Sequence, residues 1–159
     1  MTEYGLKLRE KQKVRNLYGL SETQFRNYVK SVSEKRKTGN PAERLYELLE
    51  GRLDNVVYRM ALGKSRSHAR QLVAHGHITV NGRRQTVPSF KVRVGDVVEI
   101  REGSKPNADL SDAVKRLKDK KTPDWLSINP DTGSAKITEK PKEKNFGFDL
   151  TSIIEFYSR

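Results

Sequence analysis

Cysteine is absent from this 159-residue sequence, which excludes disulfide bonds and thiol chemistry. Hydrophobic residues make up only 34% of the chain, so the sequence predicts a small core and modest stability. No run of about 18 apolar residues occurs, and the sequence therefore offers no candidate membrane span. It also lacks a phosphate-binding glycine loop and a dinucleotide fingerprint. Together these absences disfavour a membrane protein and a nucleotide-dependent enzyme.

Acidic residues are missing from one long segment. From Arg59 to Gly95 there are eight lysines or arginines and three histidines, but no aspartate or glutamate. The formal net charge is +12, and residues 1–70 contribute +8 of it, from 16 basic and 8 acidic residues. A structured surface with charge of one sign attracts a polyanion, so we expect nucleic acid as the partner.

The segment 52–100 predicts two short helices followed by strands. Apolar residues at helical spacing indicate a helix over 52–62, with Gly63 in the left-handed position that ends it. Ser65 is the expected cap of a second helix that runs to His75 and is closed by Gly76. Asn81-Gly82 is typical of a two-residue turn between strands 77–80 and 83–87, and further strands follow in 92–100.

Helices are expected on both sides of that segment. The pattern predicts helices over 3–17 and 22–36, a third after Asn40, and one capped by Asp109 that runs to about residue 120. Strands near 125–128 and 135–138 should extend the sheet, and Thr151 is the expected cap of a last helix. Because the N-terminal helices have few apolar partners, we expect the aromatic C-terminus to pack on them.

The predicted fold is therefore α+β, with a helical domain interrupted by an inserted domain. Residues 1–50 with 144–159 would form the helical domain. Residues 51–143 would place helices on a small, mostly antiparallel sheet, with the core module at about 52–100.

Enzymatic and metal-binding interpretations of this segment are weak. His68, His75 and His77 lack cysteine partners and lie close to cations, so they make a poor divalent metal site, and no cofactor is expected. Ser65 and Ser67 lie near His68, but no carboxylate close in sequence can orient that histidine, and no glycine-rich elbow surrounds either serine. We therefore expect no catalytic residues and no enzyme.

Two nucleic-acid partners remain possible on the residues alone. A helix–turn–helix protein would place Arg66, Ser67, Arg70 and Gln71 in the major groove of DNA. Against this, the hairpin that follows the helix adds basic residues and broadens the surface, which suits a folded RNA with irregular phosphate spacing.

Several short motifs resemble the RNA-binding module named after ribosomal protein S-four. They are Arg52-Leu53-Asp54, Ser65-Arg66-Ser67, Ala69-Arg70-Gln71-Leu72-Val73, His75-Gly76-His77-Ile78, Val80-Asn81-Gly82, Pro88-Ser89 and Val94-Gly95-Asp96. The flanks, including Tyr4-Gly5-Leu6, Tyr18-Gly19-Leu20 and the ending Ile154-Glu155-Phe156-Tyr157-Ser158-Arg159, resemble the bacterial S-four family of small-subunit ribosomal proteins. That family begins with a further Gly-, Pro- and Arg-rich arm, often with metal-binding Cys, so we expect an N-terminal truncation. A related module also accompanies some pseudouridine synthases and tyrosyl-tRNA synthetases, but no second region here carries catalytic motifs.

The resemblance implies a cytoplasmic protein of the small ribosomal subunit that binds 16S rRNA at a multi-helix junction, nucleates subunit assembly and influences translational accuracy. It also implies contact with neighbouring ribosomal proteins, possible repression of the protein's own mRNA and no membrane partner, and we expect a monomer when the protein is free. The candidate RNA-binding residues combine basic side chains with polar ones that can reach sugars or bases. They are Arg9, Lys13, Arg15, Arg52, Arg59, Lys64, Arg66, Ser67, Arg70, Gln71, His75, His77, Asn81, Arg83, Arg84 and Lys91.

Overall fold

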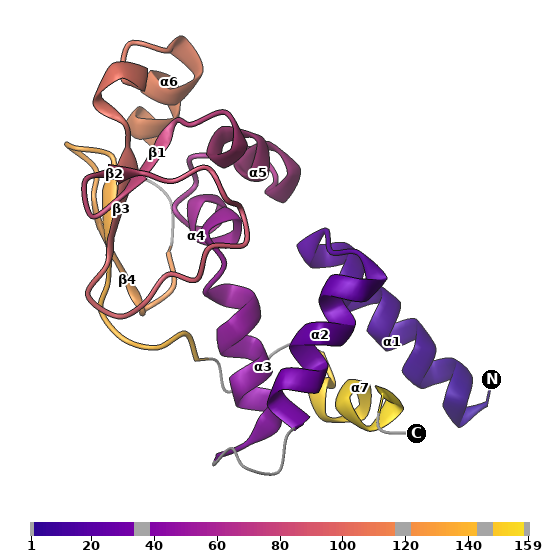
Figure 1. Cartoon of the computed structure of the whole chain (residues 1–159). Helices are drawn as coiled ribbons and strands as arrows, with labels where there is room; N and C mark the ends of the chain where they lie inside the picture. Colours follow the sequence, from indigo (N-terminus) through magenta and orange to yellow (C-terminus); the bar gives the residue numbers. More distant parts are fainter. Residues whose placement is uncertain (1, 34–38, 117–121, 143–147, 158–159) are drawn as a thin grey trace. The chain divides into compact units, whose positions relative to one another are not determined.

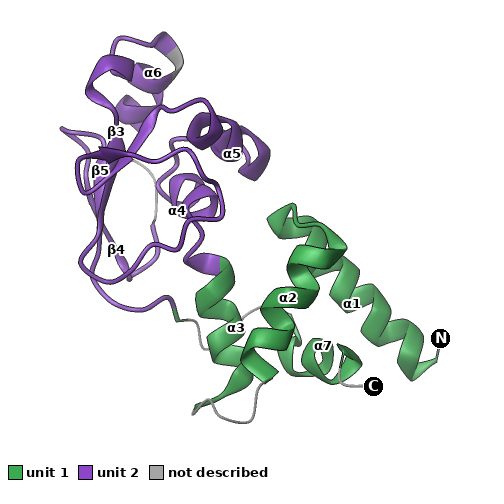
Figure 2. Cartoon of the chain, in the orientation of Figure 1, with its two compact units in different colours: residues 1–49, 142–159 green, residues 50–141 purple. Residues whose placement is uncertain are grey.

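In the computed structural model, the chain divides into two compact units (Figures 1 and 2). The structure describes residues 2–33, 39–116, 122–142 and 148–157. Unit 1 comprises residues 1–49 and 142–159, drawn green in Figure 2, and unit 2 comprises residues 50–141, drawn purple. In the part of the chain that the structure describes, no helix is long and apolar enough to cross a membrane.

Unit 1 is built from helices at the two ends of the chain. It contains α1 (Glu3–Tyr18), α2 (Glu22–Ser33), most of α3 (Pro41–Glu50) and α7 (Leu150–Tyr157). As the aromatic C-terminus predicts, α7 packs against α1 and α2. Its buried Ile153 joins a core with Val14, Phe25 and Leu45.

Local signals in the sequence set most of the helix ends in unit 1. The predicted capping box is present: Ser21 Oγ accepts from the Gln24 N–H at 3.1 Å, and Gln24 Oε1 accepts from the Ser21 N–H at 3.1 Å. Asn40 caps α3 through the Ala42 N–H. The prediction for α7 was wrong by two residues, because Asp149, and not Thr151, accepts from the N–H and hydroxyl of Ser152. The end predicted for α2, in residues 34–36, lies outside the described residues.

Unit 2 packs short helices on a five-stranded antiparallel sheet, which confirms the predicted α+β class. Its helices are α4 (Leu53–Arg59), α5 (Arg66–Ala74) and α6 (Ala108–Arg116), with a 3-10 turn at Glu102–Ser104. The strands β1 (Ile78–Val80), β2 (Arg83–Arg84), β3 (Val97–Ile100), β4 (Leu126–Asn129) and β5 (Ser134–Ile137) lie in the order β2-β1-β3-β5-β4. Because β5 pairs with β3, the second hairpin extends the central sheet as expected.

The turn between α4 and α5 differs from its prediction. Ala61, and not Gly63, adopts the left-handed conformation, with φ of 64°. Gly63 is needed for a different reason: a Cβ there would lie 2.7 Å from the Ala69 nitrogen, so only glycine allows α5 to approach the turn so closely. The two helices are therefore fixed against each other by backbone contact.

Two other element boundaries also differ from the predictions. The Asn81-Gly82 turn forms as expected, with φ of 53° and 81°, but β2 ends at Arg84, before the predicted residue 87. The chain then leaves the sheet, and the carbonyls of Pro88 and Phe90 accept from the first N–H groups of α4. Helix α6 begins at Ala108, so its cap falls on Asn107, whose Oδ1 accepts from the Leu110 N–H at 3.4 Å.

Candidate nucleic-acid interface

The exposed face of α5 carries polar and basic side chains in one stripe. Ser67, Arg70, Gln71 and Ala74 are exposed, whereas Leu72 and the other core-facing residues of the helix are buried. Spacings of three and four residues place these side chains along one side of a helix. Ser65 accepts from the His68 N–H, and this confirmed cap fixes where the stripe begins.

Arg66 lies beside this stripe and is held by two groups of α4. Its guanidinium carbon lies 4.5 Å from the centroid of the Tyr58 ring, a cation–π geometry. Its Nε also donates to Oδ1 of the buried Asn55 at 3.4 Å. Arg66 is half-buried as a result, so its substitution would disturb packing as well as charge.

Arg59 is anchored by an interior carboxylate. Its Nε and Nη2 donate to the two carboxylate oxygens of Glu50 at 2.9 and 3.1 Å. The Glu50 side chain is fully buried, whereas 32% of the Arg59 side chain is exposed. Such a fork fixes the plane of the guanidinium while leaving part of the side chain at the surface.

Arg52, one of the predicted RNA-binding candidates, is buried in unit 2. Its side chain is only 2% exposed and makes a two-point ion pair with Asp54, with Nε–Oδ1 and Nη2–Oδ2 distances of 3.1 and 3.0 Å. A side chain so buried cannot reach a phosphate without leaving the core. The charge of Arg52 therefore serves the structure of unit 2, a role that charge counting cannot detect.

Basic side chains of the α4–α5 turn, of the hairpin and of the loop after it are exposed. Lys64, Arg83, Arg84 and Lys91 all reach the surface of unit 2. Arg84 is also oriented, because its Nε donates to the Gly76 carbonyl at 3.2 Å.

Arg101, which is not among the candidates predicted from the sequence, shares an acceptor with Arg84. Its Nε donates to the same Gly76 carbonyl at 3.0 Å. Arg101 directly follows β3 and continues its alternation of buried and more exposed side chains, which is the signal in the sequence that could have identified it.

Two polar side chains among the predicted RNA-binding residues make hydrogen bonds within unit 2. Asn81 donates to Asp96 and accepts from the Val97 N–H, so both ends of its amide hold the hairpin. His77 Nδ1 lies 2.8 Å from Ser104 Oγ. Burial, reinforced by His75, Arg101 and Arg84, lowers the pKa of His77 and so favours its neutral form. His75 is exposed at the end of α5.

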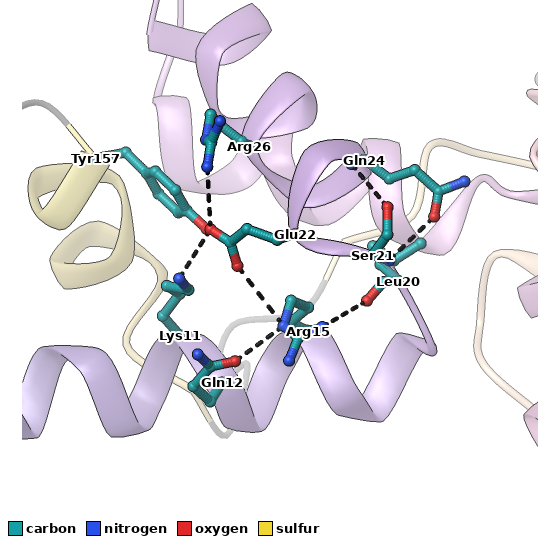
Figure 3. Close-up of polar contacts among 9 residues, drawn as sticks. All are labelled: Lys11, Gln12, Arg15, Leu20, Ser21, Glu22, Gln24, Arg26 and Tyr157. Carbon is teal, nitrogen blue, oxygen red and sulfur yellow. Dashed lines mark hydrogen bonds and ion pairs between the residues drawn. The ribbon is translucent and has the colours of Figure 1, made fainter.

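The cations of α1 divide into two groups. Arg9 and Lys13 are exposed, and the Lys13 ammonium lies 5.6 Å from the Phe148 ring centroid. Arg15 instead lies in a polar network centred on Glu22, drawn in Figure 3. It donates to Gln12 Oε1 and to the Leu20 carbonyl, so it is partly committed to holding α1 on α2.

Glu22 gathers four partners from three helices (Figure 3). The Lys11 ammonium and the Tyr157 hydroxyl each lie 2.8 Å from its Oε1. Arg15 Nε lies 3.8 Å from its Oε2, and Arg26 Nη2 lies 3.9 Å from Oε1. Burial alone would raise the pKa of Glu22, but hydrogen bonds from Lys11 and Tyr157 and the adjacent cations outweigh it and lower the pKa. Burial, together with the Glu22 carboxylate, raises the pKa of Tyr157.

The histidines do not come together as a metal site. Within the described ranges, no three residues among histidine, cysteine, aspartate and glutamate form a group that could hold an ion. His68 Nδ1 instead accepts from the Lys64 N–H at 3.0 Å.

Two family models match successive parts of the chain. Residues 1–50 match the ribosomal protein S4/S9 N-terminal domain, and residues 51–98 match the S4 domain. The small ribosomal subunit protein uS4 of Pelotomaculum thermopropionicum is 45% identical over all of this chain and 76% of its own length. The proteins of the same name from Delftia acidovorans and Thermosipho africanus are 45% and 44% identical, over 99% and 100% of this chain and 76% and 77% of theirs.

A helical domain joined to a basic S4 domain defines a class of RNA-binding proteins whose role is structural and not enzymatic. Within that class, the chain belongs to the uS4 family of small ribosomal subunit proteins.

Proposed function

We propose that this protein is a cytoplasmic, structural component of the small ribosomal subunit that binds rRNA through the basic surface of unit 2. The supporting observation is that Arg70, Arg83 and Lys91 are exposed on a segment without acidic residues. Exposed cations that have no acidic neighbours in sequence are suited to displacing counterions from phosphates. Ser67 and Gln71 on the same stripe add hydrogen-bonding groups for sugars or base edges.

The finer role that we propose is the binding of 16S rRNA at a junction of several helices. Arg9 and Lys13 of unit 1 would hold phosphates separately from unit 2, so that one protein restrains more than one RNA helix. Restraining a junction early would nucleate subunit assembly and influence translational accuracy. The same surface would serve contact with the protein's own mRNA. We also propose that the free protein is a monomer with neighbouring ribosomal proteins as its other partners.

A charge-reversal experiment tests the proposed surface. Arg70→Glu with Arg83→Glu changes two exposed residues and spares Arg66, which packs on Tyr58. Loss of two charge-assisted contacts with added repulsion should weaken 16S rRNA binding by at least about 3 kcal/mol, or more than a hundredfold. Filter binding over a salt series would measure the affinity and the number of released counterions.

Lys136→Glu with Lys140→Glu is the matched control, since it makes the same change of charge at exposed positions elsewhere in unit 2. Equal losses in the two double variants would mean that only net charge matters, and the proposed surface would be wrong. Duplex DNA as a competitor distinguishes the proposed RNA-binding protein from the alternative, a helix–turn–helix DNA-binding protein. RNA binding that DNA displaces at equal concentration would favour a DNA-binding protein.

A further inference from the structure

A polar hollow lies beside the turn that joins α4 to α5. It encloses about 390 Å³ and is lined by Tyr58, Arg59 and turn residues up to Lys64, and from the α6 side by Arg116 and Pro123. This volume equals roughly a dozen water molecules, which is enough for a phosphodiester group. No residue of the exposed α5 stripe lines it, although Arg59 and Lys64 are among the candidate RNA-binding residues described above.

The lining of this hollow favours an anion. Arg59, Lys64 and Arg116 bring three positive charges, and none of the described lining residues is acidic. Lys64 and Arg116 are exposed, so both ammonium and guanidinium groups are accessible to a ligand. The carboxylate of Glu50 is fully buried and bonded to Arg59. Cations gathered around a concave surface raise the local concentration of phosphate.

Part of the lining, the Arg59 side chain and the backbone at Lys64, is fixed before any ligand arrives. The fork from Glu50 sets the plane of the Arg59 guanidinium. The left-handed Ala61 and the close contact between Gly63 and Ala69 fix the backbone from which Lys64 extends. Lys64 is further held by its N–H bond to His68 Nδ1. Pre-ordered cations lose little entropy on binding.

We propose that this hollow binds a backbone phosphate of rRNA, with Lys64 and Arg116 as direct ligands and Arg59 oriented toward it by Glu50. This inference rests on the proposed RNA-binding function and extends it. Arg116 lies beyond residue 98, where the match to the S4 domain ends. The RNA-contacting surface of unit 2 would therefore include α6, which the S4 domain by itself does not contain.

The decisive variant is Arg116→Gln, compared with Lys115→Gln. Both residues are exposed neighbours on α6 and lose one positive charge, but only Arg116 lines the hollow. Arg116→Gln should weaken 16S rRNA binding about tenfold and reduce the slope of log affinity against log salt by about 1. Lys115→Gln should change each much less. Equal effects of the two substitutions would overturn the hollow as a phosphate site.

A double-mutant cycle tests Glu50 as the positioning residue. Glu50→Gln should reduce affinity several-fold in the wild type but have no further effect when Arg59 is already glutamine, whereas it should add fully to Arg70→Gln. Circular dichroism would establish that each variant is folded at the assay temperature. An equal loss in all three backgrounds would mean a merely structural role for Glu50 and would overturn this part of the proposal.

The outcomes also separate this inference from the proposed function. Loss of binding in Arg70→Glu with Arg83→Glu but not in Arg116→Gln would leave the proposed function standing and remove the hollow. A wild-type protein that fails to prefer 16S rRNA over duplex DNA would contradict both. A loss confined to Arg116→Gln would support the hollow and displace the α5 surface as the main site.

Discussion

The two units use their positive charges in different ways. In unit 1, Lys11, Arg15 and Arg26 surround the single carboxylate of Glu22, and Lys11 is buried at 6% exposure. In unit 2, Arg70 and Arg83 project from a segment without acidic residues. Lysines and arginines can therefore hold helices together in one region of a chain and stand exposed at the surface in another.

Aromatic residues strengthen the contrast. The Lys11 ammonium lies 5.3 Å from the ring centroids of both Phe156 and Tyr157, so C-terminal aromatics cover it. In unit 2, Tyr58 has the opposite effect, because it supports Arg66 from α4 at the edge of the exposed stripe. An aromatic neighbour can thus remove a cation from solvent or hold it where a ligand can reach it.

The largest effect should come from the buried pair within unit 2. Arg52→Ala would leave Asp54 charged and without its partner in the core, so the free energy of unfolding should fall by about 3–5 kcal/mol. Urea unfolding would measure it. Arg52→Met with Asp54→Leu should recover much of the loss, since it removes both charges. No recovery in the double variant would show that Arg52 stabilises the unit in some other way.

A smaller loss is expected from Glu22→Gln in unit 1. The substitution keeps the shape but removes the negative charge that Lys11, Arg15 and Arg26 share. Stability should fall by about 1–2 kcal/mol, because the buried Lys11 keeps only weaker partners. Affinity for rRNA, measured on folded protein, should change far less than in Arg70→Glu with Arg83→Glu. A comparable loss of affinity would mean that the network itself forms part of the binding surface.

The network should also make unit 1 sensitive to pH at both extremes. Because the pKa of Glu22 is lowered in the native state, its contribution is present above pH 4.5 and lost as pH falls below that value. The raised pKa of Tyr157 gives the opposite sign: stability is present below pH 10.0 and lost as pH rises beyond it. Urea midpoints should decline less steeply for Glu22→Gln at low pH and for Tyr157→Phe at high pH. If the urea midpoints of the variants declined as steeply with pH as those of the wild type, Glu22 and Tyr157 would not be the cause of the pH dependence.

The smallest effect distinguishes two neighbouring caps. Asp149→Ala should destabilise α7 by about 1 kcal/mol, because it removes the acceptor for the Ser152 N–H and hydroxyl. Thr151→Ala, the matched control on the same exposed turn, should have almost no effect. Thermal unfolding of both variants would measure the two losses of stability. A larger loss in Thr151→Ala than in Asp149→Ala would mean that Thr151 is the cap.

Elements were predictable where a local signal defines them. The Ser21–Gln24 capping box, the Asn81-Gly82 turn and the Ser65 cap depend on neighbours within a few residues, and all three form. Predictions failed where two acceptable residues compete at short range. Asn107 precedes Asp109, and Asp149 precedes Thr151, and in each case the cap lies two residues earlier than predicted.

Candidate site residues were harder to predict than elements, because exposure depends on distant partners. Arg52 has Asp54 two residues away, yet only the packing of unit 2 shows that this pair lies in the core, whereas Arg70 lies at the surface. Arg116 lies 52 residues after Lys64, and only the folding of α6 brings both to one hollow.

The sequence by itself determined the class of the fold, the family and the sign of the partner's charge, because periodicity, short motifs and composition are local properties. Only the tertiary structure decided which cations are available. The free energy of a charge depends on its solvent exposure and on carboxylates or rings that can lie far away in the chain. Glu22 and Tyr157, separated by 135 positions, lie 2.8 Å apart, and this contact joins the carboxylate shared by Lys11, Arg15 and Arg26 to the C-terminal helix.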